Sequence, residues 1–376
     1  MTTTSPNNSS ESRKPKFDAT TTISSEFGIF GIPLPEDDCR LVMLPVPWEV
    51  TTSYGKGASN GPRIIREASA QIDLFDFETK TAYEAGYFMK QVSKEISDKN
   101  KSYKEIAQKV IALKTEMSDD QALIQKLTDQ VNKASGELTD WVYAETNKIL
   151  KAGKLFGLVG GDHSTPLGAI KAICEKHIST DGKKSDVGIL HLDAHSDTRK
   201  AYQGFEQSHA SIMYNVMNQA EKSRPQKLVQ VGIRDFCEEE YNFIQSRSDI
   251  KTFFDISVKQ RQLKGESWAS IAADIISELP HKVYISFDID GLDPQFCPST
   301  GTPVIGGLTT DEVFFLFNVL AQSGRQIVGF DLNEVSTGDA DAAEWDGNVG
   351  ARMLYKLCNW SIVTNSATNQ AANAAL

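Results

Sequence analysis

The sequence predicts a single three-layer α/β domain, in which a mostly parallel central sheet is flanked by helices. Two observations predict this fold. The apolar runs are nearly continuous in Val, Ile, Leu and Phe, which is typical of parallel strands covered on both faces. Segments with helical spacing lie between these runs, so that strands and helices alternate along the chain. A length of 376 residues is compatible with one large α/β unit.

The elements follow from these patterns in chain order. Strands are predicted at residues 40–45, 155–159, 187–192, 227–233, 282–289 and 326–332, with a weaker one near 251–254. Helices are predicted at residues 61–70, 139–152, 166–177, 267–278, 310–323 and 348–359.

Three further segments complete the predicted organisation. Residues 91–138 are polar, with apolar residues at helical intervals, and are expected to form one or two amphipathic helices inserted into the domain. The domain itself is expected to span residues 26–360. Low-complexity sequences at residues 1–25, an N-terminal extension, and at residues 361–376 are expected to be flexible tails.

Composition excludes several classes of partner. The net charge of −11 disfavours nucleic acid and anionic membranes and favours a cationic ligand. No apolar stretch approaches the ~20 residues that cross a bilayer, and the start of the chain lacks the apolar core of a signal peptide. The five cysteines are scattered without a CxxC spacing, as expected for reduced thiols in a cytoplasmic protein.

Acidic and histidine residues follow several of the predicted strands directly. The carboxyl ends of parallel strands meet at one edge of the sheet, where open α/β folds bind their ligands. Carboxylates buried together need a partner of strong positive charge. The sequences concerned are GGDHS, DAHSD, SFDIDGLDP and GFDLNEVS, which supply His163, Asp193, His195, Asp197, Asp288, Asp290 and Glu334.

The spacing of these residues favours a pair of metal ions. Alternate residues of a strand point to the same face, so Asp288 and Asp290 can face one centre. A single DxD is often only a turn or a helix cap, but here three clusters follow three strands. Four carboxylates and two imidazoles exceed the needs of one tetrahedral ion and suit two divalent ions such as Mn²⁺ or Ni²⁺. Such a pair lowers the pKa of a bridging water, so that hydroxide forms near neutral pH.

These motifs resemble those of the ureohydrolases, the arginase and agmatinase superfamily. The resemblance covers about residues 40–360 and includes VPWEVTTSYGKGASNGPRIIREAS at 46–69 and FCPSTGTPVIGGLT at 296–309. It implies a hydrolase in which metal-activated hydroxide cleaves a C–N bond of a small cationic guanidino compound and releases urea. It also implies a homo-oligomer, a trimer or a hexamer.

The resemblance assigns a role to each site residue. One ion would be bound by His163, Asp193, Asp197 and Asp288, and the other by His195, Asp193, Asp288 and Asp290. Asp197 would also orient the hydroxide, and Glu334 would pair with the substrate guanidinium. His209, in QSHASIM, would be a proton shuttle or a substrate contact, although the family often has His-Gly where this chain has His-Ala.

The substrate depends on residues around the expected pocket. Arg199 stands where the family's arginases supply an asparagine. Its charge would disfavour an amine tail such as that of agmatine, unless another residue neutralises it. It would suit a carboxylate tail, or close the pocket through a salt bridge and leave room for free guanidine, or point to solvent. Trp345 is expected to cap a small cavity at the mouth of the site.

The overall pattern is most similar to the guanidine hydrolases of the superfamily, which are associated with Ni²⁺. The expected reaction is therefore hydrolysis of guanidine to urea and ammonia. The alternatives are a guanidino-acid amidinohydrolase, a formimidoylglutamase-like enzyme, or an agmatinase that releases urea and putrescine. An assembly protein that retains the fold without activity is the non-enzymatic alternative, disfavoured because all six expected metal-binding positions carry competent residues.

Overall fold

A parallel β-sheet forms the centre of the molecule in the computed structural model, which describes residues 28–338 and 344–366. Within these residues the sheet has eight strands in the order β2-β1-β3-β8-β7-β4-β5-β6, and every pairing is parallel. The strands are β1 (Leu41–Val46), β2 (Tyr87–Met89), β3 (Leu155–Gly160), β4 (Val187–Leu192), β5 (Lys227–Val231), β6 (Ile250–Phe253), β7 (Lys282–Asp288) and β8 (Gln326–Asn333).

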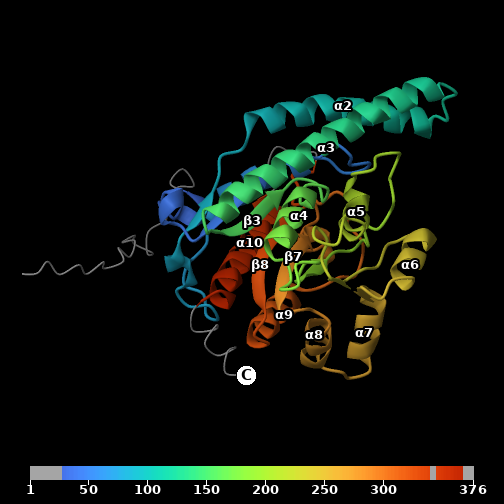
Figure 1. The fold of residues 1–376 in the computed structure, drawn as a ribbon. Helices are drawn as coiled ribbons and strands as arrows, with labels where there is room; N and C mark the ends of the chain where they lie inside the picture. Colours follow the sequence, from blue (N-terminus) through green and yellow to red (C-terminus); the bar gives the residue numbers. More distant parts are fainter. Residues whose placement is uncertain (1–27, 339–343, 367–376) are drawn as a thin grey trace, which may run out of the picture.

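Helices cover both faces of this sheet, as Figure 1 shows, and each face has its own hydrophobic core. One core includes side chains of α1 (Gly61–Ser69), α7 (Asp255–Leu263), α8 (Trp268–Ser277), α9 (Thr310–Gln322) and α10 (Glu344–Thr364). The other includes side chains of α2 (Lys94–Thr115), α3 (Gln121–Lys151), α4 (Leu167–Lys176), α5 (Ile212–Met217) and α6 (Glu238–Gln245). The predicted three-layer α/β fold is confirmed.

Six of the predicted strands are well buried, and the seventh, the weaker one near residues 251–254, is the partly exposed edge strand β6. All six residues of β4 are buried, which explains why its sequence is apolar without alternation. Strand β2 was not predicted, because three residues at the sheet edge give no recognisable periodicity. The short helices α5, α6 and α7 were missed for a similar reason, since 6 to 9 residues span only two turns or so.

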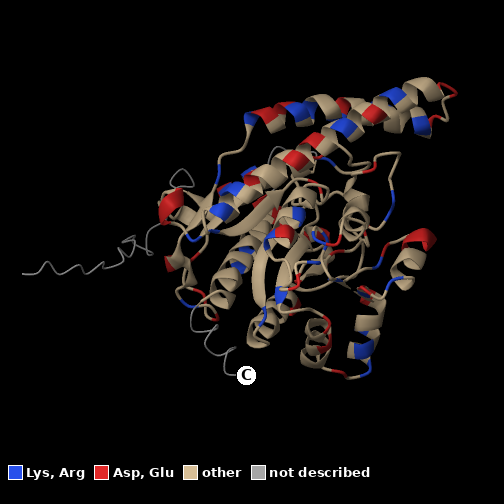
Figure 2. Cartoon of the chain, in the orientation of Figure 1, with Lys and Arg blue, Asp and Glu red and all other residues tan. Residues whose placement is uncertain are grey.

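The polar segment at residues 91–138 forms most of a helical hairpin. Helix α2 has 22 residues, and its N-terminus is capped by Ser93, whose hydroxyl accepts a hydrogen bond from the Ile96 amide. Helix α3 has 31 residues and continues through the helix predicted at 139–152, so the two predicted elements are one. Acidic and basic residues alternate along α2 and the outer part of α3 (Figure 2), which is typical of a solvated helix face.

The C-terminal boundary of the domain differs from the expected one. Residues 361–364, assigned to a flexible tail, form the last turn of α10. Ile362 is 7% exposed, and the Thr364 hydroxyl accepts a hydrogen bond from the Ile327 amide of β8 at 3.2 Å. This contact with the sheet corrects the predicted boundary. The expected N-terminal tail at residues 1–25, and residues 367–376 of the C-terminal one, lie outside the described residues.

In the two described ranges, no helix combines the length and apolarity required to cross a bilayer.

Candidate active site

Four adjacent strands at the centre of the sheet, β3, β8, β7 and β4, carry the predicted site at their carboxyl ends. Their order departs from the chain order here, which is where open α/β sheets form ligand-binding crevices. The glycines at the end of β3 allow close packing of this edge. A Cβ atom on Gly160 would lie 1.8 Å from Asn333 Oδ1, and one on Gly161 would lie 1.9 Å from the Trp48 carbonyl oxygen. Only glycine fits at either position.

His163 lies at the centre of the first group of predicted metal-binding residues. Its Nδ1 atom is 3.0 Å from Asp193 Oδ2, 3.2 Å from Asp197 Oδ2 and 3.3 Å from Asp288 Oδ2. All four side chains are buried. Because three carboxylate oxygens converge on one imidazole nitrogen, the group has the arrangement of a cation site.

A second group shares Asp193 with the first. His195 Nδ1 is 3.1 Å from Asp290 Oδ2 and 3.6 Å from Asp193 Oδ1. The two oxygens of Asp193 therefore face the two histidines separately, as expected for a bridging carboxylate. The structure thus brings all six predicted metal-binding residues together, in two groups joined by Asp193.

The electrostatics of the carboxylates explain why a cation would be stabilised here. Burial raises the pKa of Asp288 well above its usual range, and the charges of Asp290 and Asp193 raise it further. Burial and the charge of Asp193 raise the pKa of Asp197 to about 7. Carboxylates that resist ionisation together are relieved by positive charge placed among them. The donor set of buried carboxylates and imidazoles accordingly fits two divalent ions.

Further buried polar residues fix the orientation of these side chains. His163 Nε2 lies 2.9 Å from Ser286 Oγ, and Ser286 in turn donates to Asp331 at 3.0 Å. The Nε2 atom of His191 lies 2.8 Å from Asp193 Oδ2. Outer contacts of this kind hold a metal-binding histidine or carboxylate in one orientation.

The backbone adopts uncommon conformations at two of the functional residues. Asp197 has φ 55° and Glu334 has φ 62°, backbone angles that residues other than glycine rarely adopt. Surrounding contacts maintain both. The Asp197 carbonyl accepts hydrogen bonds from the amides of Met213 and Tyr214, at 3.0 and 3.1 Å. The Glu334 amide donates to the Gly161 carbonyl at 2.8 Å. These contacts fix the direction of each carboxylate.

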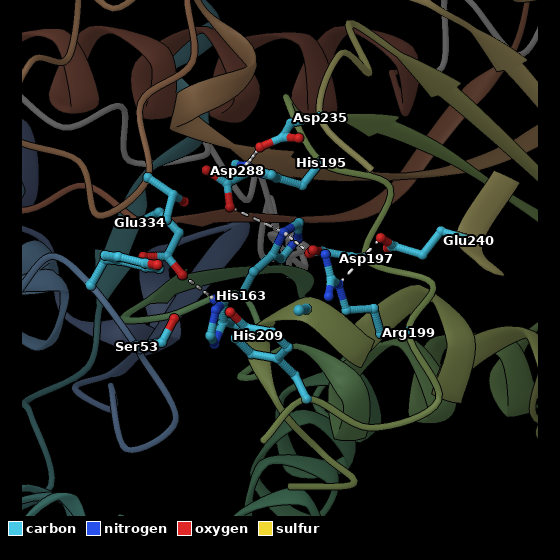
Figure 3. A pocket seen from close by; sticks show the side chains of 14 residues that line it. Ser53, His163, His195, Asp197, Arg199, His209, Asp235, Glu240, Asp288 and Glu334 are labelled. Atoms are coloured by element: carbon cyan, nitrogen blue, oxygen red, sulfur yellow. Dashed lines mark hydrogen bonds and ion pairs between the residues drawn. The ribbon is translucent and has the colours of Figure 1, made fainter. Parts of the chain in front are cut away.

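Glu334 extends into the pocket from the end of β8, close to His163 (Figure 3). Its Oε1 atom accepts a hydrogen bond from the His163 amide at 2.9 Å. Burial raises the pKa of Glu334 well above its usual range, and the charges of Asp162 and Asp290 add to the effect. A buried carboxylate in this situation gains from pairing with a cationic ligand.

The pocket in front of these groups is small, with a cavity volume of about 140 Å³. Arg199 lines it beside Tyr202 and Glu240. The Arg199 Nε atom is 3.2 Å from Glu240 Oε2, and the guanidinium carbon lies 4.9 Å from the centre of the Tyr202 ring. Of the arrangements expected for Arg199, the structure shows the salt bridge, which Figure 3 displays.

His209 faces the same cavity from the loop after β4. Its amide donates to Thr51 Oγ1 at 3.1 Å, and its Nδ1 atom lies 3.3 Å from the same oxygen. Burial, together with the nearby charges of His195, His163 and Arg199, lowers the pKa of His209 to about 4. The imidazole is therefore neutral at neutral pH.

Trp345 is the one predicted site residue that the structure places elsewhere. Its side chain is 54% exposed, and its indole N–H donates to the Gln295 carbonyl at 3.0 Å. It lines a surface depression with Ile64 and Glu67 of α1 instead of the cavity that holds His209. The predicted cap over the pocket is therefore not formed by Trp345 in this chain.

Several residues that line the cavity were not predicted from the sequence. They are Ser53, Tyr54, Tyr202, Ala210, Asp235, Glu240 and Thr302. Ser53, Tyr54 and Thr302 lie in the stretches at 46–69 and 296–309 that carry the family resemblance, but the resemblance assigned no role to them. Glu240 gave no signal because it lies in the first turn of a short helix, within the acidic run EEE, where a solvated carboxylate is the ordinary expectation.

Comparisons with known proteins agree with this geometry. A model of the arginase family matches residues 39–358. The agmatinase of Proteus mirabilis is 31% identical, over 84% of this chain and 86% of its own length. The N(1)-aminopropylagmatine ureohydrolase of Synechocystis is 28% identical, over 86% of this chain and 89% of its own.

Solved structures show the same fold. That of proclavaminate amidino hydrolase from Streptomyces clavuligerus has a TM-score of 0.65 at 22% identity, covering 93% of this chain and 100% of that one. That of the agmatine ureohydrolase of Thermoplasma volcanium has a TM-score of 0.64 at 21% identity, covering 87% and 92%. The resemblance seen in the motifs is confirmed: the chain belongs to the arginase family, whose members are binuclear-metal hydrolases of guanidino C–N bonds.

Proposed function

We propose that this protein hydrolyses guanidine to urea and ammonia. The observation that supports this substrate is the ion pair between Arg199 and Glu240, 3.2 Å apart in the wall of the pocket. Because Glu240 neutralises Arg199, the pair offers no free carboxylate to the amine tail of a substrate such as agmatine. The pairing with Glu240 also engages the charge that would otherwise attract a carboxylate tail.

The size of the pocket supports the same substrate. Pockets for drug-sized ligands typically have volumes of about 300–1,000 Å³, whereas this cavity has about 140 Å³. Tyr202 packs against the Arg199 guanidinium and narrows the space beside it. A compact cation without a tail suits these dimensions.

The side chains divide the work of the reaction. Two divalent ions, Ni²⁺ or Mn²⁺, would be held by His163, Asp193, His195, Asp197, Asp288 and Asp290, and the chemistry they supply when bound is activation of water for attack. Asp197 accepts a hydrogen bond from that water and orients it. Glu334 pairs with the guanidinium and holds its planar carbon in position for attack by that water. The Nδ1 atom of His209 is engaged with Thr51, so Nε2 is the atom that exchanges a proton with the leaving nitrogen.

Agmatine is the second candidate substrate. Its support is the agmatinase of Proteus mirabilis, at 31% identity, and the position of Asp235, which lines the pocket with a side chain that is 67% exposed. A carboxylate at the rim would attract the distal amine of agmatine. Guanidino acids and formimidoylglutamate come third, because they require Arg199 to leave Glu240.

We also propose the wider setting expected from the sequence. The protein would act in the cytoplasm as a homo-oligomer, a trimer or a hexamer, on a small cationic guanidino substrate and without nucleic acid or membrane partners. An assembly protein without activity remains the competing non-enzymatic proposal. It is opposed by the convergence of six metal-binding residues, of which five are buried and His195 is partly buried, an arrangement that a scaffold does not require.

The test is urea release by the protein loaded with Ni²⁺ or with Mn²⁺. Guanidine, agmatine, arginine and guanidino acids are compared at equal concentration, and kcat/KM for guanidine is expected to be the highest. If agmatine alone is cleaved, and Asp235→Asn lowers kcat/KM for it, the agmatinase proposal replaces this one. If the metal-loaded protein releases urea from none of these compounds, the enzymatic proposal is wrong.

A further inference from the structure

The helical hairpin α2–α3 contacts one wall of the pocket through Glu49. Lys104 of α2 forms an ion pair with Glu49, whose side chain is nearly buried at 5% exposure. The Glu49 amide donates to Asn100 Oδ1, also of α2, at 2.8 Å. The other oxygen of Glu49 accepts a hydrogen bond from the Gly57 amide at 2.8 Å. Helix α2 therefore holds Glu49 at one end of the loop 49–57, and the Glu49 side chain in turn binds the other end.

The same hairpin contacts the opposite wall of the pocket, which the second loop, residues 199–210, forms. Asn132 of α3 uses both atoms of its amide, because Nδ2 donates to the Gly204 carbonyl at 3.2 Å and Oδ1 accepts from the Glu206 amide at 3.0 Å. Lys114 of α2 donates to the Gln203 carbonyl. The turn held in this way has positive φ at Gln203 and Gly204, 55° and 90°, so it depends on such contacts for its conformation.

The two walls meet at His209. Thr51, from the first loop, accepts the hydrogen bond from the His209 amide and is fully buried. Ser53 and Tyr54 of the first loop line the cavity, as do Arg199 and Tyr202 of the second. By contrast, the predicted metal-binding residues follow strands β3, β4 and β7. The hairpin thus contacts two of the loops that line the pocket, while the strands of the sheet lead into the metal-binding side chains.

We infer that the α2–α3 hairpin is a brace that positions His209 and these two loops of the pocket, with Lys104 and Asn132 as its positioning residues. The inference rests on the proposed role of His209 and of the pocket in substrate binding. The brace acts on the fit of the substrate and leaves the metal-binding residues in place. These polar contacts from two helices to two loops add to the apolar packing that joins the hairpin to the domain.

The experiment compares Lys104→Met and Asn132→Ala with two matched controls, Lys109→Met on the same helix and Gln130→Ala on α3, both at exposed positions. Hydrogen exchange followed by mass spectrometry is measured on residues 49–59 and 199–210 of the full-length, metal-loaded protein. Lys104→Met is expected to increase exchange in the first segment, and Asn132→Ala in the second. Neither control should change either segment.

Kinetics and metal content complete the test. KM for the guanidino compound that the wild type hydrolyses is expected to rise roughly tenfold in each variant, the size of effect seen when a hydrogen bond to a charged or buried group is lost, while kcat changes less and metal content stays that of the wild type. Lys104→Arg, which keeps the charge, should restore most of the loss.

The brace and the proposed function fail in different ways. Unchanged exchange in both segments, or an unchanged KM with the fold intact, would overturn the brace. Loss of bound metal in both variants would also overturn it, because the hairpin would then support the metal centre itself. A wild type that prefers agmatine to guanidine would alter the proposed function only, since exchange is measured without turnover and KM is measured with whichever compound is cleaved.

Discussion

Glu240 is the residue on which the proposed substrate selection depends. It is 3% exposed, and it accepts hydrogen bonds from Ser196 Oγ at 2.8 Å and from the Thr198 amide at 3.2 Å while it pairs with Arg199. These contacts join helix α6 to the segment that carries Asp197. The orientation of Arg199 in the pocket is therefore set by a carboxylate on another element.

Glu240→Gln tests this dependence, because it keeps the shape of the side chain and removes its charge. We expect kcat/KM for guanidine to fall roughly tenfold, in line with the 1.5–3 kcal/mol of a hydrogen bond to a charged group. Activity toward guanidino acids with a carboxylate tail is expected to rise, because Arg199 is then free to bind them. Steady-state kinetics with both substrates measures the change.

Glu239→Gln is the matched control. Glu239 is exposed on the same helix, and the substitution removes the same charge. Equal losses of kcat/KM in the two variants would mean that the overall electrostatic field determines the activity and that the ion pair with Arg199 does not. A loss confined to Glu240→Gln, without any gain for guanidino acids, would still contradict the account of how Arg199 excludes them.

At the scale of elements, α10 is joined to the segment after α1 by a partly buried ion-pair cluster. Lys356 Nζ lies 2.6 Å from Asp76 Oδ2 and 2.8 Å from Glu78 Oε2. Burial alone would raise the pKa of Asp76, but hydrogen bonds from Lys356 and Thr79 outweigh it and hold that pKa below its usual value. Burial opposes the charge of Lys356 as well, yet Asp76 and Glu78 raise its pKa.

The direction of these shifts predicts how stability depends on pH. A carboxyl with a lowered pKa stabilises the folded state above its unfolded pKa of about 3.9 and loses this effect as the pH falls through the folded value. Lys356→Met should therefore lower the free energy of unfolding by about 1–2 kcal/mol at pH 7, and the difference should shrink as the pH falls below about 4. Urea unfolding across this range measures it.

Lys94→Met provides the comparison, because Lys94 pairs with Asp98 in a salt bridge whose side chains are 87% and 57% exposed. This control is expected to give no resolvable change at either pH. A Lys356→Met difference that persisted unchanged at low pH would show that lost packing of the lysine stem against Phe314, 4.9 Å from Nζ to the ring centre, is the cause, and that the charges are not.

At the scale of the whole molecule, the parts of the fold that could be predicted are those with a repeating local signal. Buried parallel strands such as β4 and β7 are continuous apolar runs, and the metal-binding residues follow them in motifs that share one sheet edge. Glu240 could not be found in this way, because its pairing with Arg199 joins segments 41 residues apart through tertiary packing. Trp345 was misplaced for the converse reason, since closeness to Glu334 in the chain does not determine which cavity a side chain lines.

Metal removal tests whether the two groups of metal-binding residues each bind an ion and stabilise the fold. The two groups of metal-binding residues share Asp193, whose oxygens face His163 and His195 separately, so two ions per chain are expected. His195→Asn should reduce the stoichiometry to one while the group around His163 persists. Chelation should lower the melting temperature of the wild type, because ions that bind only the folded state stabilise it, by about 2.7 kcal/mol at a concentration 100 times Kd.

Re-addition of Ni²⁺ or Mn²⁺ to chelated protein should restore the melting temperature in two saturable steps in the wild type and in one step in His195→Asn. Elemental analysis of the same samples gives the stoichiometry independently of activity. The physical reason is that carboxylates crowded by burial and by one another, as at Asp288, are relieved by each cation in turn. One equivalent of metal in the wild type, or two in His195→Asn, would contradict a site divided in this way between neighbouring strands.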